Sequence, residues 1–115
     1  MESILISVKK LCGIADKYDA FDDDLIMHIN SVFMILYQMG IGPSTSAFHI
    51  KDEFSVWTDF IPETSPNYES VKSYVGFKVR LMFDPPTSSI HMDAIKQNIS
   101  ELEWRLYTQS ELESR

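Results

Sequence analysis

Two adjacent prolines divide the C-terminal half of the chain into two helical segments. On both sides of Pro85-Pro86 the apolar residues recur at intervals of three and four, a spacing typical of helices. A helix does not continue through two prolines, because proline has no backbone N–H and restricts the residue before it. We therefore predict one helix over 67–84 and another over 88–109, the second capped by a residue of Thr87-Ser88-Ser89.

The helix predicted over 67–84 is apolar on nearly all sides, which indicates two buried faces. Lys78 and Arg80 interrupt this surface, and a charge on a buried helix must reach solvent or find a partner. Arg80 could pair with Asp84, one turn further on, at the end of the same helix. Alternatively, the two cations could form ion pairs across a subunit boundary. The sequence leaves both interpretations open.

The helix predicted over 88–109 carries one apolar seam, formed by Met92, Ile95, Ile99, Leu102 and Leu106. The seam spans roughly two heptads, too short for an autonomous coiled coil, so we expect this helix to pack on its neighbours. Trp104 lies off the seam and beside Tyr107, which suggests a contact surface. The segment 107–115, which includes Leu112, is polar; it is either frayed helix or ordered by a partner.

Three further helices are expected upstream. We predict a first helix over 2–12, stopped at Gly13, and a second over 22–39 with Asp22 as its N-cap. A short third helix over 54–61 follows an irregular loop at 43–53, and Trp57 is expected in the core. The 115 residues match a single domain. The predicted fold class is all-α, a small bundle of four to five helices in one domain over 1–115.

Composition excludes several classes of protein. The net charge of −7 weighs against nucleic-acid binding, which needs clustered Lys and Arg. Cys12 is the single cysteine, so an intrachain disulfide and a cysteine metal cluster are both excluded. No apolar run approaches the roughly 18 residues of a membrane span, and Glu2 stands where a signal peptide has basic residues. We expect a cytoplasmic protein that does not bind membranes.

Motifs for catalysis are absent from the sequence. Asp24 and His28 are one turn apart and could begin a metal site, but no second histidine follows at ligand spacing, and a helix start favours aspartates anyway. His49 and His91 have no adjacent nucleophile or acid partner, and no hydrolase motif occurs. Gly40-Ile41-Gly42 is not a phosphate loop, since no Lys-Ser/Thr follows. We predict no enzymatic activity, no catalytic residue, no metal and no cofactor.

Several blocks of sequence, in their order and spacing, resemble the small head-tail connector (adaptor) proteins of tailed phages and prophages of Gram-positive bacteria. The most specific blocks are Ile29-Asn30-Ser31-Val32-Phe33, Phe83-Asp84-Pro85-Pro86-Thr87-Ser88 and Glu101-Leu102-Glu103-Trp104-Arg105-Leu106. Further matching blocks are Phe21-Asp22, Trp57-Thr58-Asp59-Phe60-Ile61, Tyr74-Val75 and Lys78-Val79-Arg80-Leu81. The resemblance covers most of the chain and says little about 44–47 and the C-terminal end.

The resemblance implies an all-helical structural subunit without enzymatic activity. It implies assembly as a ring, twelve-fold in our expectation, between the portal protein and a downstream tail-completion or stopper protein. Such a ring extends the channel used in DNA packaging and ejection, and DNA passes through without specific binding. The expected location is the virion neck, after synthesis in the cytoplasm of the bacterial host.

The resemblance also suggests roles for individual side chains. A helix with two apolar faces suits a subunit that buries one in its own core and another against a neighbour. We expect Lys78 and Arg80 to face acidic residues of that neighbour, and Trp104, Tyr107 and Leu112 to dock on the portal. The acidic balance suits a conduit that repels phosphates.

Two hypotheses of other classes remain. An acidic helical regulator or DNA mimic would need carboxylates in rows along an exposed helix face, whereas the acids here gather at helix starts and in the tail. A metal-dependent enzyme using Asp24 and His28 would need stoichiometric metal in the purified protein.

Overall fold

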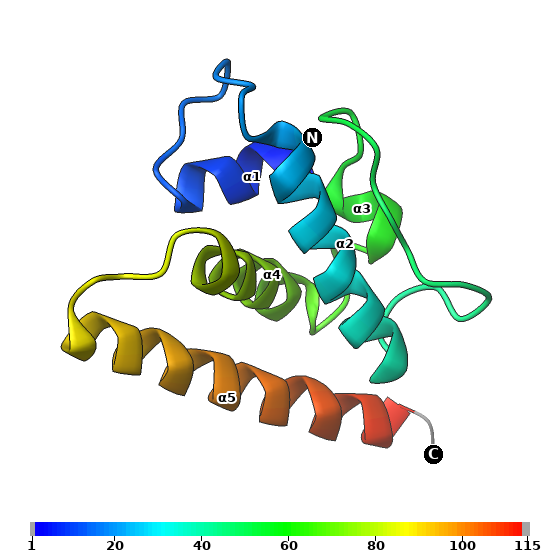
Figure 1. Cartoon of the computed structure of the whole chain (residues 1–115). Helices are drawn as coiled ribbons and strands as arrows, with labels where there is room; N and C mark the ends of the chain where they lie inside the picture. The colour runs from blue at the N-terminus through cyan, green and yellow to red at the C-terminus, as the bar shows by residue number, and fades with distance from the viewer. Residues whose placement is uncertain (1, 114–115) are drawn as a thin grey trace.

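The computed structural model describes residues 2–113, which form five helices: α1 (Ile4–Leu11), α2 (Asp22–Gln38), α3 (Trp57–Phe60), α4 (Tyr68–Phe83) and α5 (Ser89–Glu113) (Figure 1). Within this range, β pairing is limited to one isolated bridge between Ser3 and Val56. The predicted all-α fold is confirmed. No helix in the described range is both long and apolar enough to cross a membrane.

Helix α4 is the centre of the bundle and packs against α1, α2 and α5. Val71, Val75 and Val79 are fully buried, and so is Tyr74. Burial raises the pKa of the Tyr74 hydroxyl far above its usual value, and the carboxylate of Glu103 on α5 adds to this effect. The apolar residues around α4 are therefore covered by helices of the same chain.

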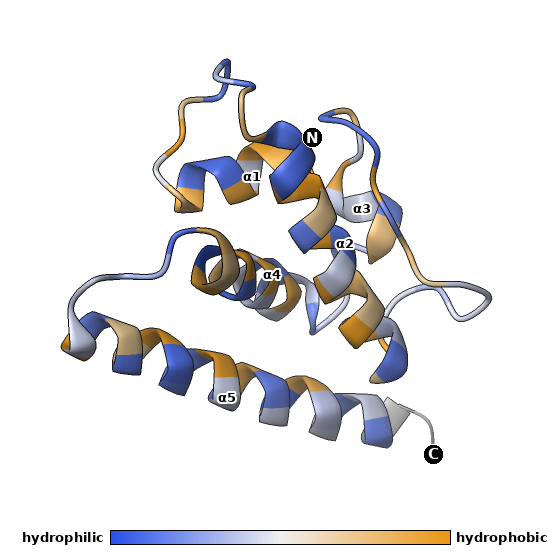
Figure 2. Ribbon diagram, viewed as in Figure 1, coloured by the Kyte–Doolittle hydropathy of each residue, from blue (hydrophilic) through white to orange (hydrophobic). Residues whose placement is uncertain are grey.

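Helix α5 lies along α4 through the predicted seam: Ile95, Ile99 and Leu106 are buried and Leu102 is half-buried. Figure 2 shows the hydrophobic residues of α5 on the side facing α4 and the hydrophilic ones on the opposite side. The helix extends to Glu113, four residues beyond the predicted end. The Ser110 hydroxyl donates a hydrogen bond of 2.6 Å to the carbonyl oxygen of Met39, at the end of α2. This long-range bond anchors the C-terminal end of α5, where the polar sequence had predicted that the helix would stop.

The start of α2 differs from the prediction. Asp22 is not the N-cap but the first helical residue, and its carboxylate lies 2.9 Å from the Nζ atom of Lys9 on α1. The contact is ionic rather than a well-aligned hydrogen bond. Lys9 is 2% exposed and also donates to the carbonyl oxygen of Asp16, at 2.9 Å. Phe21 takes the N-cap position, and its ring packs edge-on against Phe83, with centroids 5.2 Å apart.

Helix α3 is shorter than the predicted 54–61. Phe54 is 79% exposed and belongs to a turn in which its N–H donates to the carboxylate of Asp52. The apolar spacing that predicted a helix from residue 54 therefore included an exposed residue, Phe54. Trp57 is buried as predicted, and its indole N–H donates to the hydroxyl of Ser7 on α1 at 3.1 Å. With Phe33, Phe48 and Phe60, it forms an aromatic cluster between α2, α3 and the 43–53 loop.

The loop at 43–53 is irregular, as predicted, and one side chain of α2 holds it. The amide of Asn30 donates to the carbonyl oxygen of Ile50 at 3.0 Å and accepts from the N–H of Ile50 at 2.8 Å. The amide thus satisfies both backbone groups of a buried residue in the loop.

Replacement of Asn30 should therefore detach the loop. We expect Asn30→Ala to lower the free energy of unfolding by about 1–3 kcal/mol, because two backbone groups of Ile50 lose their partners. Urea unfolding measures this loss, and proteolysis of the native protein should become faster within 43–53. Ser31→Ala, at the exposed neighbouring position, should change stability by less than about 0.5 kcal/mol. Equal stability of the two variants would show that the Asn30 bonds do not hold the loop.

Candidate interaction surfaces

The outer side of α5 exposes large apolar residues. Trp104 is 67% exposed and Tyr107 is 53% exposed, one turn apart on the same helix, as the sequence predicted. A side-chain hydrogen bond with Glu111 raises the pKa of the Tyr107 hydroxyl. Ile90, at the other end of α5, is also exposed. The side chain of Leu112 lies outside the described residues. The structure therefore brings together Trp104 and Tyr107 from the predicted portal-docking group.

Lys78 and Arg80 are half-buried on α4 and form no salt bridge within residues 2–113. The intrachain pair between Arg80 and Asp84 is not formed. The Nε atom of Arg80 is buried and has no hydrogen-bond partner in the described structure. Of the two interpretations of these cations, the intrachain pair is thus not observed.

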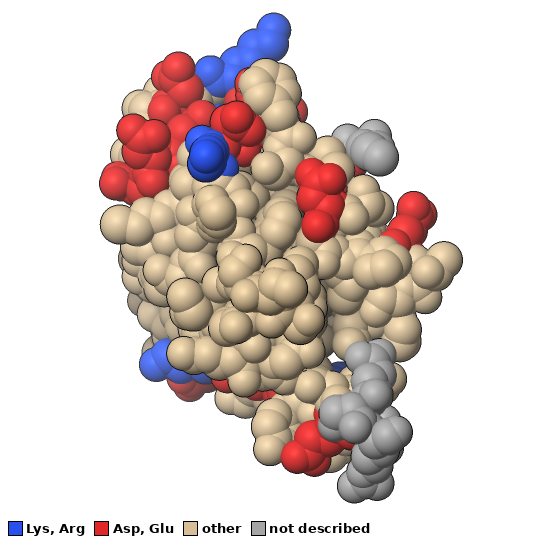
Figure 3. All heavy atoms as spheres, turned by 90° about the vertical axis from the view of Figure 1, so that its right-hand side faces the viewer, with Lys and Arg blue, Asp and Glu red and all other residues tan. Residues whose placement is uncertain are grey.

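Acidic side chains gather around the start of α2. A shallow hollow there is lined by Asp16, Asp19, Asp22 and Glu53, with Lys17 beside them. Figure 3 shows carboxylates concentrated at the top of the molecule, where α2 begins. In residues 2–113, no group of three or more His, Cys, Asp or Glu side chains is arranged to hold a metal ion. Asp24 and His28 thus have no third protein ligand in the described structure.

An uncharged surface is the feature that our sequence reasoning missed. Residues 25–50 contain no Asp, Glu, Lys or Arg, although 23% of the chain is charged. In α2 the exposed side chains of this stretch are Met27, Ser31, Met34, Tyr37 and Gln38. Figure 3 shows a broad area without charged side chains on the side of the molecule that carries the 43–50 segment. The signal in the sequence was the length of the uncharged run, which helical periodicity alone does not report.

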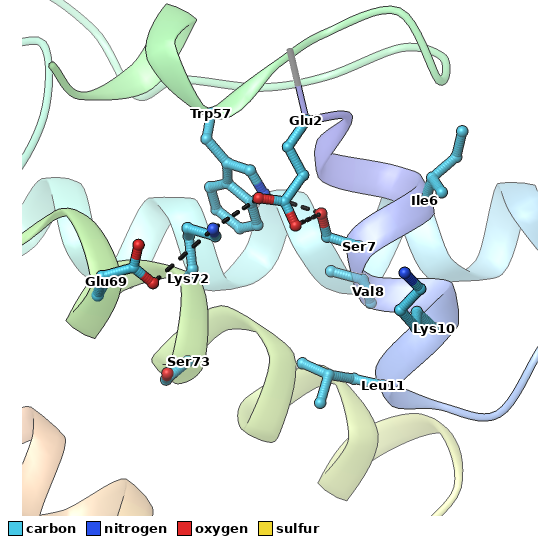
Figure 4. A pocket seen from close by; sticks show the side chains of 10 residues that line it. All are labelled: Glu2, Ile6, Ser7, Val8, Lys10, Leu11, Trp57, Glu69, Lys72 and Ser73. Carbon is cyan, nitrogen blue, oxygen red and sulfur yellow. Dashed lines mark hydrogen bonds and ion pairs between the residues drawn. The ribbon is translucent and has the colours of Figure 1, made fainter. Parts of the chain in front are cut away.

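Two hollows flank α4, and we refer to them together as the α4 groove. Its first part is a hollow of about 300 Å³ between α1 and α4, with Ile6, Leu11 and Trp57 among its apolar walls (Figure 4). Its second part, of about 280 Å³, lies between α4 and α5 beside Phe77 and Leu102. Ser73 on α4 lines both parts and therefore lies between them.

Ion pairs border the groove. Glu2 lies 2.6 Å from Lys72 and accepts a hydrogen bond from the Ser7 hydroxyl at 2.8 Å. The hydrogen bond with Lys72 lowers the pKa of Glu2, and Glu2 in turn raises the pKa of Lys72. Lys72 also lies 3.8 Å from Glu69. Glu2, Glu69 and Lys72 at the border of the groove are thus paired with one another.

Comparison with known proteins identifies the family. The model of a family described as phage connector protein matches residues 4–113, the span from the start of α1 to the end of α5. The chain belongs to the phage connector protein family. This confirms the resemblance drawn from the blocks of sequence, and the family supports a structural head-tail connector role. No curated protein and no solved structure gave a significant match.

Proposed function

We propose that this phage connector protein assembles as a ring, twelve-fold in our expectation, below the portal of a tailed phage. The ring extends the channel through which DNA passes during packaging and ejection, and it offers a docking surface to a tail-completion or stopper protein. The observation that carries the proposal is the family match over all five helices. In this role the chain acts in the virion neck as a structural subunit and not as an enzyme, after synthesis in the cytoplasm of the bacterial host.

Exposed side chains support assembly. A closed ring of identical subunits needs two different surfaces on each subunit, because each copy contacts two neighbours in different ways. Met27 and Met34 remain exposed on α2, and Trp104 and Tyr107 on α5, so apolar side chains are available both to a neighbouring subunit and to the portal. Lys78 and Arg80 have no salt bridge in residues 2–113, so they are available to acidic residues of a neighbour.

The charge distribution also suits this role. A net charge of −7 repels phosphates, so DNA can pass without being held by counterion release. A DNA mimic would instead display rows of carboxylates along a helix, whereas the outward face of α2 is uncharged beyond Asp24. The connector role is therefore the function that the structure and the family support best.

The proposal is tested by sedimentation with the purified portal protein of the same phage. The expected result is co-sedimentation of portal and connector, with a mass that gives the copy number of the ring. Absence of co-sedimentation at every salt concentration would count against the proposal. A monomeric state of the connector alone would not, because the ring can form on the portal.

Trp104 provides a sharper test of portal docking. We expect Trp104→Ala to weaken portal binding by about 30-fold or more, since a large aromatic at the centre of an interface is worth about 2 kcal/mol or more. The free energy of unfolding should change by less than about 0.5 kcal/mol, because the side chain is mostly exposed. The matched control is Ile90→Ala, which removes a similarly exposed apolar side chain from the other end of α5. Wild-type affinity of Trp104→Ala would place the docking surface elsewhere.

A further inference from the structure

We propose that the ring, if it forms as inferred above, is closed by one specific contact: the outer face of α2 in one copy packs into the α4 groove of the next. The outer face of α2 comprises Met27, Ser31, Met34 and Gln38. The α4 groove comprises the two hollows that Ser73 lines. The occupant of the groove is thus a second copy of this chain.

The outer face of α2 is suited to burial. Met27 is 59% exposed and Met34 is 46% exposed, and methionine adapts its shape to irregular surfaces. Ser31 and Gln38 between them carry no charge, so burial of the face requires no ion to lose its water. The bonds from Asn30 to Ile50 fix the uncharged 43–50 segment beside the same helix. A helix face that carries exposed methionines and no charge, in a chain of this acidity, is suited to a subunit contact.

The α4 groove has a complementary charge pattern. The first hollow is lined by two acids, Glu2 and Glu69, and two bases, Lys10 and Lys72. The second is lined by one acid and one base, Glu101 and Arg105, which pair with each other. The groove therefore has no net charge. A charged guest would disturb these pairs, whereas an uncharged helix face leaves them intact.

Apart from the cations Lys78 and Arg80, most of the remaining surface disfavours contacts between copies. The chain carries a net charge of −7, so most encounters between two copies bring acidic surfaces together. The outer face of α2 and the neutral groove are a pair of surfaces that meet without this repulsion. The apolar walls of the groove, including Ile6, Leu11 and Trp57, offer contact to the methionine side chains.

The positions of the two surfaces suit a ring. Figure 4 looks into the first hollow, and α2 passes behind α1 and α4 in this view. The groove therefore opens on the side of the molecule away from α2. A contact between different surfaces on opposite sides of a subunit is repeated from copy to copy and closes only as a ring or continues as a filament.

Cysteine cross-linking tests the contact directly. In a Cys12→Ala background, the double variant Ser31→Cys and Ser73→Cys is incubated with a short bismaleimide, alone and with the portal. We expect a ladder of covalent oligomers that ends at the ring size. Each single variant should give no cross-linked products, and a mixture of the two single variants should give covalent dimers only. In the control, Ser100→Cys on the exposed side of α5 replaces Ser73→Cys and gives no ladder.

Each outcome decides between the two proposals. A ring by mass without cross-linked products overturns the α2–groove contact and leaves the connector function standing. Cross-linking of Ser31→Cys with itself overturns the contact as well, because it shows a symmetric α2–α2 dimer. Absence of any ring, with and without portal, overturns the connector proposal together with this inference.

A charge introduced on the outer face of α2 gives an independent test of the contact. We expect Met34→Glu to weaken ring assembly at least tenfold in sedimentation, because the added carboxylate must be buried against a neighbour or keep the copies apart. The matched control is Met82→Glu on α4, where the methionine is 43% exposed, close to the 46% of Met34. Unchanged assembly of Met34→Glu would contradict the proposed contact, provided that both variants show wild-type unfolding curves.

Discussion

Lys9→Ala should destabilise the protein by about 3 kcal/mol or more, because removal of one partner leaves a largely buried carboxylate without its counter-ion. Lys9 is 2% exposed and Asp22 is 27% exposed, and their charged atoms are 2.9 Å apart. The same ammonium group donates to the carbonyl oxygen of Asp16, so its loss also releases the 12–21 connection. Urea unfolding followed by circular dichroism measures the change.

The neighbouring lysine supplies the control. Lys10 lies in the same turn of α1 but is exposed, so Lys10→Ala should change the free energy of unfolding by less than about 0.5 kcal/mol. The double variant Lys9→Met and Asp22→Asn removes both charges and keeps most of the volume, and it should recover much of the loss. Loss of less than about 1 kcal/mol in Lys9→Ala would show that the pair is hydrated and contributes little.

Gly42→Ala should cost about 2–5 kcal/mol, from two effects that add. Gly42 has a φ of +90°, a conformation that costs a residue with a side chain about 1–2 kcal/mol. A Cβ atom there would also lie 2.3 Å from Cε1 of Phe60, and crowding of a packed core costs about 1–3 kcal/mol. Phe60 has little room to move, because its ring packs against Phe33 and Phe48.

Gly13→Ala separates the two effects. Gly13 ends α1 with a φ of +75°, and nothing lies within 4 Å of a Cβ built there. Gly13→Ala should therefore lose only the backbone contribution, about 1–2 kcal/mol. The difference between the two variants in urea unfolding measures the collision with Phe60. If both variants lose the same amount, the aromatic cluster adjusts freely and the collision contributes nothing.

The prediction for α4 shows what helical periodicity can and cannot establish about burial. Apolar residues on nearly all sides of 67–84 correctly indicated more than one buried face. They did not indicate what covers those faces, and the structure shows that α1, α2 and α5 of the same chain do. Methionine and aromatic side chains that no helix of this chain covers remain on α2 and α5. Periodicity measures how much of a helix is buried but not by which chain.

By itself the sequence determined the all-α class, the break at Pro85-Pro86, the seam of α5 and the contrast between buried Trp57 and exposed Trp104. These features depend on residues within a few positions of one another. The tertiary structure decided the Lys9–Asp22 pair, the Asn30–Ile50 bonds, the Ser110–Met39 bond and the groove at Ser73. Each of these joins segments that are distant in the chain, by up to 71 residues. Such partners meet only when helices pack, and no local pattern encodes which turn of one helix lies against which turn of another.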